Sequence, residues 1–298
     1  MSIRINPNPA PDLLADIALD RQEQNTALQE ISTGQSVNQL SDDPSAAAQV
    51  VLNHAQNSQN TQYLSTISSL QPEAQTIDST LNSAVEAVTQ AISLGTEGAN
   101  SDLSDSDRQA IATQLQGIQS QVLSLANLQY QGNYVFSGTA TSTQPFVLDS
   151  SQPDGVKYNG NTGVNSVEIS PGERIQVNQP GSQIFTNSSG DLFGALSGLI
   201  TALQNNSGIA AANTNLNTAL NQLTTQQVFY GSNLQQLNAA QTNLNNSQVQ
   251  VATQENSLVG VDLTTAITNL QQASTATSAI LSATNQVLTT LNLLDYLT

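Results

Sequence analysis

Few side chains in this sequence could perform chemistry on a substrate. His54 is the only histidine and the chain has no cysteine, so a nucleophilic triad would have no other imidazole base and a structural zinc site is nearly excluded. Asp102, Asp105 and Asp107 form an acidic cluster, but they lack the D-x-D-x-D-G spacing that brings carboxylates together around calcium. No zinc-protease, phosphate-loop or dinucleotide-binding motif is present. We therefore predict no catalytic residue, no cofactor, no metal site and no enzymatic activity.

The acidic residues are better explained as parts of helix ends. Carboxylates near a helix N-terminus interact favourably with the helix dipole, and Ser104 with Asp107 has the spacing of a capping box. A second helix start is predicted at Asp42, Asp43 and Pro44. Asp43 is a suitable N-cap, and Pro44 fits the first helical position, where its missing N–H costs nothing.

Composition and charge exclude several classes of partner. The net charge is −17 although only 9% of the residues are charged, because bases are scarce. The bases are scattered along the chain: Arg4, Arg21, Arg108, Lys157 and Arg174. Nucleic-acid and anionic-membrane binding both require clustered bases, and no window approaches the about 18 apolar residues of a membrane span. The start, MSIRINPNPAP, also lacks the apolar core of a cleaved secretion signal. We expect neither a nucleic-acid nor a membrane partner.

Heptad spacing of apolar residues predicts long helices that pair with other helices. One such series is Leu216, Leu223, Tyr230, Leu237, Leu244, Val251 and Leu258. The other faces carry Gln, Asn, Ser and Thr, and no base follows Arg174. Because burying an ion costs several kcal/mol, a face without charge is easily covered by another protein. This composition indicates a subunit that is packed on several sides.

The predicted fold is mainly α, with a small β domain inserted into a long antiparallel helical bundle or coiled coil formed by the N- and C-terminal arms. Between Tyr134 and Phe185 the apolar period changes to two, and Pro171-Gly172 is a suitable type II turn. Pro72 should kink or interrupt its helix. The expected segments are an N-terminal assembly helix (1–42), a helical rod (43–132 and 191–260), an outward-facing β domain (133–190) and a C-terminal assembly helix (261–298).

The two ends are the predicted assembly interface. Each end is one narrow amphipathic helix, and isolated helices are marginal in water, so we expect residues up to about 35 and beyond about 262 to become ordered on assembly. The apolar residues of this interface are Leu14, Ile17, Leu28, Ile31, Leu263, Ile267, Leu270, Leu281, Leu288, Leu291 and Leu294.

The same two ends resemble a known family. LQEISTGQSVNQLSDDPSAAAQVV (Leu28–Val51) is similar to the N-terminal segment of flagellins, and Val261–Thr298 is similar to the matching flagellin C-terminus. Within that superfamily, three features resemble the flagellin-like hook-associated proteins of the hook–filament junction. They are NYVFSGTATSTQPF (Asn133–Phe146), the run Tyr158–Phe185 and the ending Leu-Leu-Asp-Tyr-Leu.

This resemblance implies a non-enzymatic structural subunit of the bacterial flagellum that joins the hook-associated region to the filament and transmits torque in motility. It implies export to the cell exterior by a flagellar type III apparatus, without a cleaved signal peptide. The implied partners are flagellin, another hook-associated protein, further copies of the chain in a ring, and a cytoplasmic export chaperone at the C-terminal helix.

Two alternative functions remain open at this point. The chain could be a flagellin, with the same fold and a filament role. It could also be a surface binding module, in which Tyr134, Phe136, Phe146 and Tyr158 of the β domain would line a glycan site. Aromatic residues at strand spacing are more often part of a core, which favours the structural role.

Overall fold

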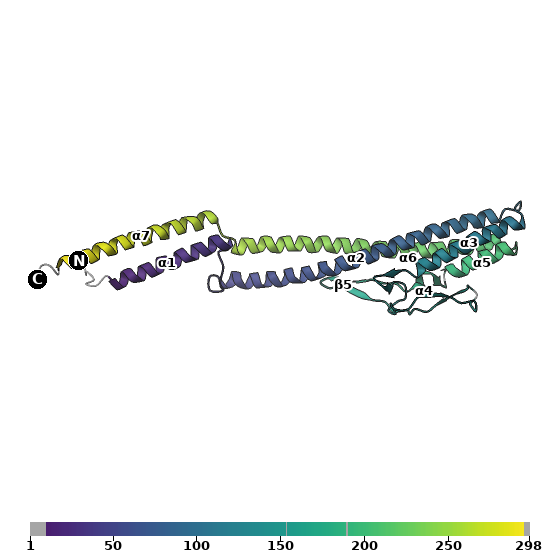
Figure 1. Cartoon of the computed structure of the whole chain (residues 1–298), viewed down its shortest axis with the longest axis horizontal. Coiled ribbons are helices and arrows are strands. Elements are labelled where there is room, and N and C mark those ends of the chain that lie inside the picture. Colours follow the sequence, from purple (N-terminus) through teal and green to yellow (C-terminus); the bar gives the residue numbers. More distant parts are fainter. Residues whose placement is uncertain (1–9, 153, 189, 295–298) are drawn as a thin grey trace. The chain divides into compact units, whose positions relative to one another are not determined.

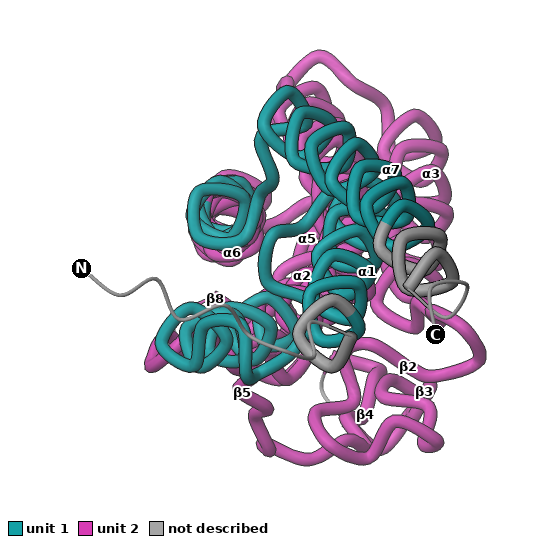
Figure 2. Tube along the Cα trace, turned by 90° about the vertical axis from the view of Figure 1, so that its left-hand side faces the viewer, with its two compact units in different colours: residues 1–59, 247–298 teal, residues 60–246 magenta. Residues whose placement is uncertain are grey.

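The computed structural model describes residues 10–152, 154–188 and 190–294 (Figure 1). The chain divides into two compact units, shown in different colours in Figure 2. We call residues 1–59 with 247–298 the terminal unit, and residues 60–246 the central unit. Helices α2 (Pro44–Gly98) and α6 (Ile209–Val259) contribute residues to both units.

In the terminal unit, α1 (Ala10–Thr33) and α7 (Leu263–Leu294) lie side by side (Figure 1). This confirms the predicted pairing of the two arms. The buried residues between them are small: Ala27, Ala266 and Ala273 are at most 4% exposed. Small side chains allow two helices to approach closely, because the distance between helix axes depends on the side chains at the contact.

A backbone bridge joins the end of α1 to the start of α7. Gln35 and Gly260 form an isolated antiparallel bridge. Beside it, the N–H of Ser36 donates to the carbonyl oxygen of Val259 (2.7 Å), and the N–H of Val261 donates to that of Gly34 (3.1 Å). Gly34 has φ +70°, the left-handed conformation in which helices commonly end and which glycine adopts without strain. This bridge fixes where the two arms begin to run together.

The helix starts follow local capping chemistry. Helix α2 begins at Pro44, and Asp43 Oδ1 accepts from the N–H groups of Ser45 (2.9 Å) and Ala46 (3.0 Å), which is the geometry of an N-cap. The capping box at the start of α3 (Asp105–Ala126) is confirmed, since Ser104 and Asp107 bond reciprocally.

Helix α2 continues through Pro72 to Gly98, so the interruption that was one of the two expected effects of this proline is wrong, while the alternative of a kink stays a prediction. Proline removes one helical hydrogen bond. The fully buried Ile67 and the nearly fully buried Ile77 on either side of Pro72 add packing that outweighs this loss, since tertiary packing provides most helical stability.

Helices dominate the core of the central unit. Helix α3 packs against α5 (Leu192–Gln204). Along α6, the heptad residues are at most 5% exposed, as predicted: Leu216, Leu223, Tyr230, Leu237, Leu244 and Val251. At the end of the helix the stripe shifts by one residue, so that Val259 is buried while Leu258 is only partly buried.

The strands of the described residues form short antiparallel hairpins with no larger sheet. The pairs are β1 (Gln129–Tyr130) with β2 (Asn133–Tyr134), β3 (Phe146–Leu148) with β4 (Val156–Tyr158), β5 (Ser166–Ser170) with β6 (Glu173–Gln176), and β7 (Thr186–Asn187) with β8 (Gly190–Asp191). The short helix α4 (Gly181–Ile184) lies between β6 and β7. Pro171-Gly172 connects β5 to β6, and Gly172 has φ +78°, as a type II turn requires.

Candidate functional site

Most of the described leucines and isoleucines that were predicted to form the assembly interface face water in the structure. Five of them are 47–67% exposed: Leu14, Leu28, Leu263, Ile267 and Leu281. Ile17, Ile31 and Leu270 are partly buried. The side chains of Leu288, Leu291 and Leu294 lie outside the described residues. Since alanines occupy the contact between α1 and α7, the larger aliphatic side chains remain available to another protein.

Further apolar side chains extend this exposed set beyond the predicted residues. They are Leu19, Leu40, Val51, Leu52 and Val249, all at least 56% exposed. We call these five residues and the five exposed interface residues together the terminal apolar surface. Sequence reasoning missed the additional residues because it selected positions at heptad spacing. The adjacent pair Val51-Leu52 could have indicated an exposed apolar residue. Successive residues of a helix point in different directions, so one partner helix does not cover both.

The charge of α7 is unusual for an exposed helix. From Leu263 to Leu294 it carries no acidic or basic residue. Covering α7 with another protein would therefore remove no ion from water, a step that costs several kcal/mol for each charge. A long, exposed and neutral helix with aliphatic side chains is suited to burial in an assembly.

Carboxylates at the helix junctions are used in turns and caps. Asp42 Oδ2 accepts from the backbone N–H groups of Asn38 (3.0 Å) and Gln39 (2.8 Å). Asp262 accepts from the N–H of Thr264 (2.9 Å) at the start of α7. Backbone hydrogen bonds, from Ala46 to Asp43 and from Thr264 to Asp262, hold the pKa of both carboxyls below the usual range. These groups order the chain where the helices begin.

The residues that were considered for chemistry on a substrate also take part in contacts between or within helices. His54 is largely exposed, and its Nε2 lies 3.0 Å from Glu255 Oε1 on the neighbouring helix. Asp105 Oδ1 lies 3.6 Å from Arg108 Nη1. Across the described ranges, no three His, Asp or Glu side chains gather as a metal site would require. No helix in the same ranges is sufficiently long and apolar to cross a membrane.

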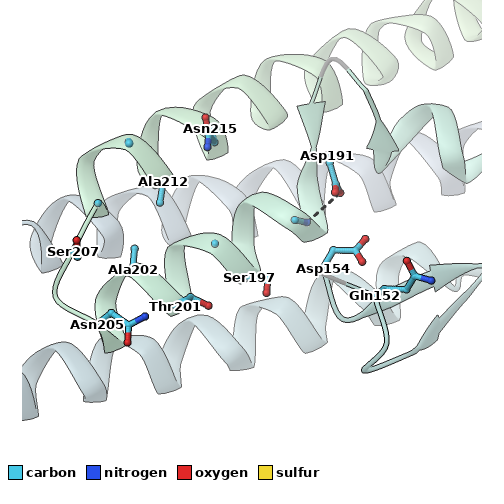
Figure 3. A pocket seen from close by; sticks show the side chains of 14 residues that line it. Gln152, Asp154, Asp191, Ser197, Thr201, Ala202, Asn205, Ser207, Ala212 and Asn215 are labelled. Atoms are coloured by element: carbon cyan, nitrogen blue, oxygen red, sulfur yellow. Dashed lines mark hydrogen bonds between the residues drawn. The ribbon is translucent and has the colours of Figure 1, made fainter.

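A groove of about 800 Å³ in the central unit is lined mostly by small residues of α5 and the start of α6 (Figure 3). Asp154 and Asp191 lie at one end of it, and Asp191 Oδ1 accepts from the N–H of Gly194 (3.1 Å). Burial raises the pKa of Asp191. No histidine or lysine lines the groove.

The aromatic residues of the β domain mainly form its core. Phe136 and Phe146 are fully buried, and the ring of Phe146 lies 5.5 Å from that of Phe185 and 5.3 Å from that of Phe193 on α5. Tyr158 is partly buried, and its hydroxyl donates to the carbonyl oxygen of Phe136 (3.0 Å). These contacts attach the hairpins to α5. They also remove both phenylalanines from the proposed glycan site.

Comparisons with known proteins point to one family. Residues 8–141 match the bacterial flagellin N-terminal helical region, and residues 213–297 match the bacterial flagellin C-terminal helical region. The chain is 30% identical over 274 residues to flagellar hook-associated protein 3 of Salmonella typhimurium, covering 82% of this chain and 84% of that protein. It is also 30% identical over 278 residues to flagellar hook-associated protein 3 of Escherichia coli, covering 84% and 86%.

Solved structures share the fold. A putative flagellar hook-associated protein from Vibrio parahaemolyticus aligns with a TM-score of 0.65 at 22% identity, covering 74% of this chain and 100% of that one. The flagellar junction protein FlgL from Legionella pneumophila aligns with a TM-score of 0.63 at 16% identity, covering 71% and 100%. From the two helical regions and the relatives that match most of its length, the chain belongs to the flagellar hook-associated protein 3 family of flagellin-like proteins.

Proposed function

We propose that this chain is a structural subunit of the bacterial flagellum that joins the hook-associated region to the flagellin filament. The observation that carries this proposal is its match, over more than four-fifths of its length, to two flagellar hook-associated proteins 3. The exposed terminal apolar surface supports the same role, because a junction subunit must present surface to several neighbours.

The terminal unit is suited to transmitting torque. Burying a fully exposed leucine or isoleucine side chain contributes about 1.5–3 kcal/mol, and the partly exposed residues of the terminal apolar surface would each contribute a share of this. Several such residues between neighbouring subunits would therefore offset the cost of ordering the helices. Close-packed helices have low compressibility, so a rotation applied at one face of the assembly would reach the other face. In this proposal residues 1–42 and 261–298 are the assembly helices, and residues 133–190 face outward.

The partners of this surface would be flagellin, another hook-associated protein and further copies of the chain. Before export, a cytoplasmic chaperone would cover the apolar residues of the C-terminal helix. The chain would then leave the cell through the flagellar export apparatus without cleavage of a signal peptide, and its terminal helices would become ordered on assembly. The protein would have no enzymatic activity.

Site-specific labelling of native flagella tests this function. Because the chain has no cysteine, an exposed residue such as Lys157 in β4 can be replaced by cysteine and labelled with a maleimide probe for electron microscopy. We expect one band where the hook meets the filament. Label along the whole filament would instead favour the flagellin role, which the two flagellin helical regions make the second candidate. No label on any flagellum would overturn both.

A further inference from the structure

Helix α1 carries opposite charges on two of its flanks. Leu14, Arg21 and Leu28 follow one another at seven-residue spacing, as do Asp16, Glu23 and Glu30. A seven-residue step nearly completes two helical turns, so each series stays on one side of the helix. The two series are offset by two residues, which places them about 200° apart around the axis. We call them the basic flank and the acidic flank.

Neither flank finds its counter-charge within the described part of the chain. No ion pair forms there at Arg21, Glu23 or Glu30. Helix α7, the neighbour of α1, carries no charged residue that could supply one. The Oδ2 atom of Asp20, also on α1, is buried without a hydrogen-bond partner among the described residues. Among the described residues, the charges of Arg21, Glu23 and Glu30 are therefore not compensated by an ion pair.

Each flank borders a surface groove. Glu23 and Glu30 line a groove of about 490 Å³ together with residues of α7, including Asn269 and Gln272. Arg21 lines a groove of about 710 Å³ formed by α1 and the turn that precedes α2. Both flanks also carry exposed leucines, Leu14 and Leu28 on the basic side and Leu19 beside the acids. A neighbouring helix that packs on either flank of α1 could thus contact both an exposed leucine and a charged side chain.

We propose that the two flanks bind each other between neighbouring copies of the chain, so that Arg21 of one copy lies against Glu23 and Glu30 of the next. This inference rests on the proposed function, because it defines the contact between copies in the junction ring. Two different patches that complement each other make a head-to-tail contact, which closes into a ring when the rotation between copies allows it. Opposite charges would fix the order and direction of the copies, because like-charge contact is unfavourable.

Asp42 is the competing partner for Arg21 within one chain, since both line the same groove. Its Oδ2 atom already accepts two backbone N–H groups, and no ion pair joins it to Arg21 in the described structure. The backbone carbonyl of Glu30 accepts from the N–H of Gly34, while the side chains of Glu23 and Glu30 form no ion pair among the described residues. The unpaired acids of a second copy are therefore the better partners.

Disulfide cross-linking in isolated flagella tests the contact. Residues 21 and 30 of one helix are separated by about 13 Å along the axis, which is beyond the reach of a disulfide within one chain. In an Arg21→Cys/Glu30→Cys chain, oxidation should therefore give dimers and a ladder of larger oligomers. Each single-cysteine chain should stay monomeric under the same conditions, because a head-to-tail contact does not bring identical positions together.

The outcomes separate this proposal from the function on which it rests. If the double-cysteine chain is present in flagella that swim but does not cross-link, the flank contact is wrong and the junction role stands. Dimers from either single-cysteine chain would show a symmetric contact and would also overturn the flank proposal. Absence of the wild-type chain from isolated flagella would overturn the proposed function itself.

Charge reversal gives an independent measurement. Arg21→Glu alone and Glu23→Arg/Glu30→Arg alone should each abolish swimming, and the three substitutions combined should restore it. Lys157→Glu makes the same change in net charge as Arg21→Glu at an exposed position of the β domain, and it should swim normally. Rescue of Arg21→Glu by Asp42→Arg, without rescue by the two glutamate substitutions, would place the base in an intramolecular pair and overturn the proposal.

Discussion

The guanidinium of Arg108 binds the carboxyl end of α2 at Gly98, with Nε 3.2 Å from the Gly98 carbonyl oxygen. The same side chain donates to the carbonyl oxygens of Asn100 (2.8 Å) and Leu103 (2.7 Å), and Arg108 is only 5% exposed. Carbonyl groups at a helix C-terminus lack intrahelical partners, and a cation there interacts favourably with the helix dipole. One buried base therefore organises the whole turn from α2 to α3.

Replacing this base should destabilise the central unit strongly. Arg108→Ala would leave three carbonyl groups without their donor, and we expect a loss of about 2–4 kcal/mol in the free energy of unfolding. Arg108→Lys should recover only part of it, because an ammonium group cannot reproduce the planar fork of guanidinium donors. Urea unfolding followed by circular dichroism measures both. Arg174→Ala removes an exposed base and is the control, and equal midpoints for the two alanine variants would contradict the role of Arg108.

The sequence predicts the helix starts well, but it does not reveal the role of Arg108 in the turn from α2 to α3. The difference lies in how far apart the interacting groups are along the chain. The Ser104–Asp107 box depends on residues within one turn of each other, so their spacing alone identifies it. Arg108 bonds carbonyl groups up to ten residues away, at Gly98, and backbone acceptors have no side-chain signature. The bridge between Gln35 and Gly260 is invisible in the sequence for the same reason.

Heptad spacing identifies long helices but does not say which protein covers them. In α6 the heptad residues are buried within the chain, as Leu223 and Leu237 show. In the terminal unit, Leu263 and Leu281 remain exposed while Ala266 and Ala273 make the contact with α1. Apolar periodicity measures only the tendency to leave water. Whether an apolar helix face packs within the chain or against another protein is therefore decided by the three-dimensional structure.

Tyr230 supplies a second test of the core. It is fully buried, and its hydroxyl oxygen accepts from the backbone N–H of Gln179 (3.0 Å). Burial raises the pKa of the Tyr230 hydroxyl well above its usual range, so this group is protonated at neutral pH. Tyr230→Phe would leave the Gln179 N–H unpaired, and we expect a loss of about 1–2 kcal/mol. Tyr134→Phe, in a partly buried residue of β2, should cost less in the same urea titration, and a loss as large as that of Tyr230→Phe would argue against the hydrogen bond.

Glu73 should make stability depend on pH. Burial raises the pKa of Glu73, whose side chain lies beside Leu70 and Val177. A carboxyl with a raised folded-state pKa binds its proton more tightly when folded, so stability falls as the pH rises through the unfolded and then the folded pKa. Glu73→Gln cannot ionise and should therefore be more stable than the wild type at pH 7.

The advantage of Glu73→Gln should shrink in acid. At a pH below about 4, the wild-type carboxyl is largely protonated in both states and the desolvation cost disappears. Urea midpoints of both chains at pH 7 and at lower pH measure the difference. Glu86→Gln, at an exposed position of the same helix, is the matched control. A constant difference between wild type and Glu73→Gln across the pH range would refute the assignment of this cost to ionised Glu73.

Leu281 tests whether the terminal apolar surface serves assembly. It is 47% exposed on the neutral helix α7, so Leu281→Asp should change the stability of the free chain by no more than about 0.5 kcal/mol. Burying the new carboxylate between subunits would cost several kcal/mol, which should abolish junction assembly and swimming. Leu148→Asp places the same charge at a 77% exposed leucine of the β domain and should swim normally. Normal swimming of Leu281→Asp would show that this part of α7 stays in water in the flagellum, and equal loss in both variants would show a general effect of the added charge.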